Sequence, residues 1–266
     1  MAALGLTGTR VPAARAALRA ALDAPNQLWL PTAAMIALAP VADAALVTRF
    51  RASLLDGEWS RAAALAALGD VPVALQERVV DDLAAGLFSP MVVRQVGGDL
   101  ALRRIAARGL ARIASRGDDG IVRALDDPEA AASVGLLLAR VIAPPGPVTG
   151  AEAALVRFAP RIAQAARDAL ASPAGIDRVL DALAVPGRFG PLTGDAAEVS
   201  SEAAAACDAM VRTLAPSLAA LVTHGDASIR RRALVVLART DAPEAAEALA
   251  RAAGDDDPTV SEDALT

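Results

Sequence analysis

Apolar residues recur along the chain at the spacing of one helix face. In the stretch GDASIRRRALVVLAR, residues 225–239, they fall at intervals of four, one and three residues, at Ile229, Ala233, Leu234 and Leu237. Such intervals place side chains on one side of an α-helix. The stretch therefore predicts a helix that buries this side against neighbouring elements.

A similar pattern appears elsewhere in the chain. The stretch GDLALRRIAARGLAR, residues 98–112, aligns with 225–239 without a gap and shares its Gly-Asp start, its Arg-Arg pair and its Leu-Ala-Arg end. Partial copies begin at Asp127 and Asp257. Because Asp226 and Asp257 are 31 residues apart, the sequence indicates an internal repeat of about 30 residues.

Each copy opens on an aspartate that we expect to cap the following helix. A side-chain oxygen at this position accepts hydrogen bonds from the free amides of the first turn. In the two partial copies proline comes next, where the missing amide costs nothing. We therefore interpret four aspartates as structural residues of the repeat: Asp99, Asp127, Asp226 and Asp257.

The composition favours helices throughout the chain. Hydrophobic residues make up 55% of the 266 positions and aromatic residues only 2%, while alanine is abundant. Alanine has the highest helix propensity, whereas strands prefer β-branched and aromatic residues. We expect an all-α protein in which second helices, such as one within 241–255, alternate with the aspartate-led ones. Helix pairs of this length are typical of an α-solenoid.

The repeat resembles the HEAT repeat family, in particular the short bacterial HEAT-like units that also occur in phycobilisome lyases. The pattern Asp-x-x-[Ile/Val/Leu]-Arg-x-x-Ala-x-x-x-Leu carries the resemblance from Asp99 and from Asp226. This family is armadillo-like, and the resemblance implies a right-handed superhelix of antiparallel helix pairs. In such arrays the aspartate-led helix usually lines the concave surface.

We expect one solenoid domain over residues 1–266. Two breaks rich in proline and glycine interrupt it, but neither is long enough to act as a free linker. The clearest repeats cover 56–142 and 222–266, and irregular helical units cover 1–55 and 151–221. The last copy stops at the end of the sequence part-way through its helix, so a longer natural chain or a docked partner would cover that end.

The arginines of the repeat have two candidate roles. The resemblance implies that Arg103 and Arg230 pair with turn aspartates of the neighbouring repeat and form a structural ladder. Arg104, Arg231 and Arg232 are candidates for partner binding, because a guanidinium holds a carboxylate through two hydrogen bonds. An acidic segment of a protein partner would suit such a patch.

The sequence GRFG, residues 187–190, is a second candidate for partner binding. Phe189 is one of four phenylalanines in the chain and stands beside Arg188 between two glycines. Aromatic residues and arginine are frequent anchors of protein interfaces. The alternative is that Phe189 packs back onto the helices.

Residues suited to catalysis or metal binding are sparse. His224 is the single histidine and Cys207 the single cysteine, and no third residue that would orient such a pair is evident. We expect Cys207 to be a small buried residue of a helix. The acidic clusters lack the spacing of a calcium loop and suit helix starts. We expect no enzymatic activity, no metal and no cofactor.

Charge and composition disfavour nucleic acid and membranes as partners. The net charge of −5 opposes attraction to phosphate. Aromatic residues that could support a displaced base are few, with no tyrosine and only two tryptophans, Trp29 and Trp59, and Trp59 holds a core position in a weaker copy that begins at Asp56. The chain shows neither the pattern of a secretory signal nor an apolar run of membrane-spanning length. We expect a cytoplasmic protein.

Together these patterns predict a non-enzymatic scaffold or adaptor that binds a protein partner through its extended surface. The resemblance leaves two alternatives open. One is an accessory subunit of the bilin-lyase type, which holds a cofactor and its acceptor protein. The other is a DNA-binding HEAT-like protein. The identity of the partner and the oligomeric state do not follow from the sequence.

Overall fold

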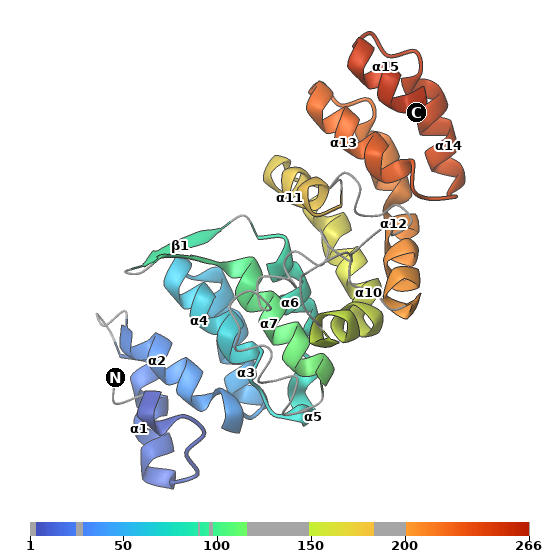
Figure 1. The fold of residues 1–266 in the computed structure, drawn as a ribbon. Helices are drawn as coiled ribbons and strands as arrows, with labels where there is room; N and C mark the ends of the chain where they lie inside the picture. Colours follow the sequence, from blue (N-terminus) through green and yellow to red (C-terminus); the bar gives the residue numbers. More distant parts are fainter. Residues whose placement is uncertain are drawn as a thin grey trace. The chain divides into compact units, whose positions relative to one another are not determined.

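The chain folds into helices that gather in two units, Met1–Ala132 and Ser133–Thr266 (Figure 1). The computed structural model describes residues 4–24, 29–89, 91–95, 98–115, 149–183 and 201–265. Apart from one hairpin, the elements of these residues are helical, so the predicted helical fold class is confirmed. Within the described ranges no helix has both the length and the apolar character needed to span a bilayer.

The helices of the first unit pack around one central helix. They are α1 (Pro12–Leu22), α2 (Trp29–Leu38), α3 (Ala44–Ala52), α4 (Glu58–Leu68), α5 (Val73–Gln76), α6 (Val80–Leu87) and α7 (Leu102–Ser115), with 3-10 turns η1 (Leu4–Leu6), η2 (Ala39–Val41) and η3 (Ser53–Leu55). Helix α4 packs against α2, α3, α6 and α7. Its N-cap is Gly57, which makes no side-chain hydrogen bond, so Asp56 is not the cap of this helix.

A β-hairpin precedes α7, where the sequence predicts the start of a helix. Strand β1 (Val92–Gln95) pairs antiparallel with β2 (Gly98–Ala101), and Arg94 lies opposite Asp99. The prediction that Asp99 caps a helix is wrong, because Asp99 lies in β2 and α7 begins only at Leu102. The physical reason lies in β1, which opens with two valines whose branched side chains favour extended backbone, and 98–101 pair with this strand.

Helix α7 packs closely against α4 and α6 through small residues. Leu102 and Leu110, two of its predicted apolar positions, are fully buried. A Cβ atom added to Gly69 would lie 2.6 Å from the Cα atom of Gly109. The two glycines therefore allow a direct approach of the backbones at the end of α4 and the middle of α7.

The helices of the second unit form two rows. They are α10 (Thr149–Ala169), α11 (Pro173–Leu183), α12 (Ser201–Leu221), α13 (Ala227–Leu237), α14 (Pro243–Ala252) and α15 (Pro258–Leu265). Contacts between next-but-one helices join α10, α12 and α14 into one row and α11, α13 and α15 into another (Figure 1). We call these the even row and the odd row. Contacts between successive helices, such as α13 and α14, join the two rows.

The aspartate-led helices of the odd row begin as the sequence predicts. The amide of Ser228 donates to Asp226 at 2.8 Å, and the amide of Thr259 donates to Asp257 at 2.9 Å. Both predicted caps are confirmed, whereas Asp127 lies outside the described residues. The predicted apolar face of α13 is buried, at Ile229, Ala233, Leu234 and Leu237.

Candidate functional site

Arg230, the first of the three consecutive arginines, ties α13 to the turn before α15. The side chains of Arg230 and Asp255 are each 14% exposed, and the Nε and Nη2 atoms of Arg230 each donate to a carboxylate oxygen at 2.9 Å. Its Nη1 atom donates to the carbonyl oxygen of His224 at 2.9 Å. The hydrogen bond from Arg230 lowers the pKa of Asp255. This is the kind of link to a turn aspartate that the resemblance implies for Arg230.

Arg231 and Arg232 join α13 to both of its neighbours in the odd row. Arg231 donates to Asp263 of α15 at 2.6 Å. Arg232 donates to two carboxylates of α11, those of Asp177 at 2.6 Å and Asp181 at 2.8 Å. An acidic partner would have to displace these carboxylates. The structure therefore gives Arg231 and Arg232 intramolecular partners in place of the predicted cationic patch.

The structure describes only part of the remaining candidate residues. Arg103 is half-buried in the first turn of α7. Arg104 follows it in the same helix, but its side chain is outside the described part of the structure. Arg188 and Phe189 also lie outside the described residues. Of the predicted partner-binding residues, only Arg231 and Arg232 have side chains that the structure describes, and these two are consecutive in α13.

Cys207 is a buried residue of a helix, and His224 supports a turn. Cys207 is 1% exposed in α12, as predicted, and burial raises the pKa of its thiol to about 12. The Nδ1 atom of His224 accepts a hydrogen bond from the amide of Asp226 at 3.0 Å and so supports the turn before α13. Among the residues that the structure describes, no group of three or more His, Cys, Asp or Glu side chains is arranged to hold a metal ion.

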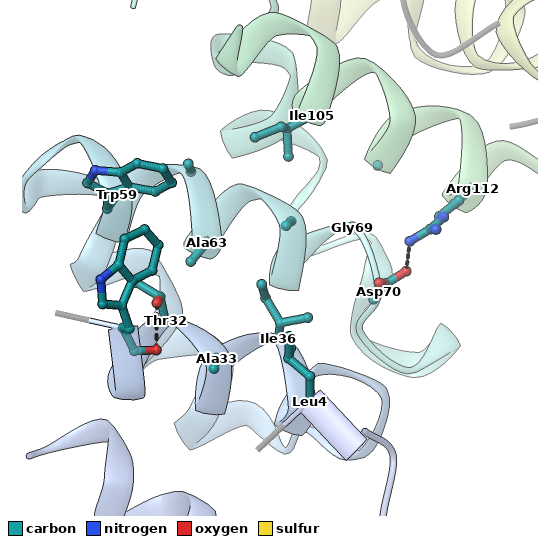
Figure 2. Close-up of a pocket in the computed structure, with 14 residues that line it drawn as sticks. Leu4, Thr32, Ala33, Ile36, Trp59, Ala63, Gly69, Asp70, Ile105 and Arg112 are labelled. Carbon is teal, nitrogen blue, oxygen red and sulfur yellow. Dashed lines mark hydrogen bonds and ion pairs between the residues drawn. The ribbon is translucent and has the colours of Figure 1, made fainter. Parts of the chain in front are cut away.

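The first unit contains a hollow that the sequence did not predict. Its volume is about 660 Å³, and helices α2, α4 and α7 form its walls (Figure 2). Each helix contributes residues at the spacing of one face. They are Trp29, Thr32, Ala33 and Ile36 on α2, Trp59, Ala62, Ala63 and Ala66 on α4, and Ile105, Gly109 and Arg112 on α7, with Leu4, Gly69 and Asp70 beside them.

One end of the hollow is aromatic and the other is charged. Trp29 and Trp59 meet edge to face with ring centroids 4.7 Å apart, and Trp29 is 63% exposed. Figure 2 shows Trp59 at one side and the ion pair of Arg112 with Asp70 at the other, with Ile36 between them. The hollow thus combines an apolar interior with a paired cation and anion.

The hollow exists because the face of α4 that lines it carries small residues. Ala62, Ala66 and Gly69 follow Trp59 at intervals of three, four and three residues, so these positions share a face. Apart from Trp59, the residues of α4 that line the hollow are alanines, whose side chains leave space between α2 and α7. The prediction of a core position for Trp59 is therefore corrected, because its side chain is half-buried and lines the hollow.

Comparisons with known proteins do not place the chain in a family. No protein-family model matches it, and no curated protein matches it. The similar solved structures include two crystal structures of engineered proteins. The first is 20% identical to this chain and has a TM-score of 0.32. The match spans 94% of this chain and 66% of the engineered protein. The second is 19% identical to this chain and has a TM-score of 0.31. The match spans 94% of this chain and 93% of the engineered protein.

Proposed function

We propose that the chain is a non-enzymatic HEAT-like α-solenoid, a scaffold or adaptor that binds a protein partner through its extended surface. The observation that supports this proposal best is the two-row arrangement of the second unit. Within each row every described helix contacts the next one, so each row offers a surface that grows with the number of repeats. Extended surfaces of this kind are suited to binding macromolecules.

The odd row is the proposed binding surface. Its helices α13 and α15 are the aspartate-led ones, which line the concave surface in the HEAT family. Arg231 and Arg232 connect α13 with α15 and with α11, so ion pairs hold this row together along its length. Because these arginines are already paired with carboxylates, the proposed partner is recognised by the shape and the apolar content of the row, and an acidic segment is not required.

Photo-crosslinking tests the proposal. A photoreactive amino acid is placed at one exposed position on each odd-row helix, at Ala174, Ser228 or Leu265, and on two even-row helices, at Ala209 or Ala246. The full-length variants are expressed in the cells from which the protein comes. We expect one protein to be crosslinked from all three odd-row positions. That protein, once purified, should bind the chain with a measurable Kd.

The even-row positions are the matched controls. Crosslinks to the same protein from both rows alike would contradict the proposed surface. Absence of a common protein among the three odd-row positions would contradict the scaffold function itself, because an extended contact must reach several successive helices.

A further inference from the structure

We propose that the hollow of the first unit is a binding site for an uncharged, elongated apolar molecule with a single hydrogen-bonding head group, such as a long-chain alcohol. The head group would lie at the ion pair of Arg112 with Asp70, and the apolar chain would extend along α4 towards Trp29 and Trp59. This inference is independent of the proposed protein-binding function.

The size and lining of the hollow suit such a ligand. Its volume of about 660 Å³ lies within the range of roughly 300–1,000 Å³ that is typical of small-molecule sites. The path along α4 from Trp59 to Asp70 is roughly 16 Å long at the rise of an α-helix. Eleven of its fourteen lining residues are alanine, glycine, isoleucine, leucine or tryptophan. An apolar chain in this space would remove both its own surface and that of the lining residues from water.

The charged end selects an uncharged head group. Arg112 and Asp70 form an ion pair in which both side chains are partly buried, at 25% and 34% exposure. A carboxylate head would be attracted by Arg112 but repelled by Asp70, and an ammonium head would meet the opposite combination. A hydroxyl group donates to a carboxylate and accepts from a guanidinium, so it can satisfy both without separating the pair.

The aromatic end provides a direct readout. Trp29 and Trp59 are the two tryptophans of the chain, and the chain has no tyrosine. Its intrinsic ultraviolet fluorescence therefore comes almost entirely from the hollow. A bound apolar chain displaces water from the exposed ring of Trp29 and shifts the emission to shorter wavelength.

The test is a fluorescence titration of the full-length protein with three probes of equal chain length: 1-decanol, decanoate and decyltrimethylammonium. We expect a saturable blue shift with 1-decanol and at least tenfold weaker binding of both charged probes. Equal or tighter binding of either charged probe would overturn the proposed head-group contact. No saturable shift with any of the three would overturn the site.

Three variants locate the ligand. Asp70→Asn leaves Arg112 without this carboxylate, so it should reverse the preference in favour of decanoate. Ala66→Phe places a large ring in the hollow and should abolish binding of 1-decanol, whereas Ala85→Phe, at an exposed position of α6 that does not line the hollow, should not. Circular dichroism and the thermal midpoint establish that each variant is folded.

Ala33→Phe, on the α2 wall of the hollow, is a second variant that fills the hollow with a large ring. It serves as the test if Ala66→Phe, on the α4 wall, does not fold. Unchanged binding of 1-decanol by a folded filling variant would show that the ligand lies elsewhere and would overturn the proposal. A blue shift produced by an amphipathic apolar peptide and not by 1-decanol would also overturn it, because the hollow would then be a groove for a protein segment.

Discussion

At the scale of single residues, the arginines of α13 act on the chain itself. Three consecutive guanidinium groups would repel one another on an isolated helix, but here they point to carboxylates of different elements. Arg230 reaches the turn at Asp255, Arg231 reaches α15, and Arg232 reaches α11. The run of arginines is therefore a set of intramolecular links that starts from one helix and reaches both of its neighbours.

We expect Arg230→Gln to lower the thermal midpoint of the second unit more than Arg212→Gln does. The two arginines each pair with one aspartate, but the pair of Arg230 is 14% exposed on both sides, whereas Arg212 and Asp241 are 57% and 80% exposed. Exposed pairs contribute little because water and salt screen them. Equal midpoints for the two variants, measured by circular dichroism at 222 nm, would contradict this expectation.

The difference between wild type and Arg230→Gln should also depend on pH. Arg230 lowers the pKa of Asp255 below its ordinary value of 3.8 in the folded protein. The stabilisation from this pair is therefore present above pH 3.8 and is lost as the pH falls through the lowered pKa. Thermal midpoints measured from neutral pH downward should converge for the two proteins only below 3.8.

At the scale of elements, glycine decides how closely the helices of the first unit approach. A Cβ atom on Gly109 would lie 3.0 Å from the Cα atom of Gly69 and 3.0 Å from a methyl carbon of Leu83. One of these neighbours is backbone, which cannot move aside as a flexible side chain can. The contact between α4 and α7 therefore depends on the absence of a side chain at this position.

Gly109→Ala should lower the free energy of unfolding of the first unit by about 1–2 kcal/mol. Overpacking typically costs about 1–3 kcal/mol, and the higher helix propensity of alanine returns up to about 1 kcal/mol. Urea denaturation followed by tryptophan emission measures this unit, because Trp29 and Trp59 both lie in it. Gly5→Ala is the control, since no atom lies within 4 Å of its added Cβ. Stabilisation by Gly109→Ala would show that helix propensity outweighs the close contact.

The elements were predictable where local pattern and capping agreed. Asp226 and the apolar face of α13 show both signals, and the structure has the helix with that cap and that buried face. At Asp99 the same residue pattern lies in strand β2, because 98–101 pair antiparallel with β1, and such pairing is not visible in a helical alignment. The hollow was missed for a related reason: helical spacing identifies the face of α4 that carries Ala62 and Ala66, but not how far away its neighbours lie.

At the scale of the whole molecule, each unit has its own organisation. The first unit surrounds α4 with other helices, whereas each described helix of the second unit contacts the next helix of its own row and an adjoining helix of the other row. In a nearest-neighbour array, stability is approximately the sum of terms for each repeat and for each interface. A change at the end of such an array acts first on the helices that touch it.

Val260→Asp tests this expectation in the second unit. Val260 is fully buried in α15, and an unpaired charge at that position should detach the helix. Hydrogen exchange measured by mass spectrometry should become faster in α13 and α14, which contact α15, while α10 keeps its protection. Leu265→Asp is the control, because Leu265 is 75% exposed. Faster exchange throughout α10 as well would show that the unit opens as one cooperative body.

The buried position of Cys207 has a practical consequence for work on the two units. Reaction with maleimides or spin-label reagents requires a thiolate that the reagent can reach. A thiol that is 1% exposed, with a pKa of about 12, meets neither condition at neutral pH. New cysteines introduced one in each unit can therefore be labelled without replacing the natural one, and the distance between the labels can be measured in the otherwise unaltered protein.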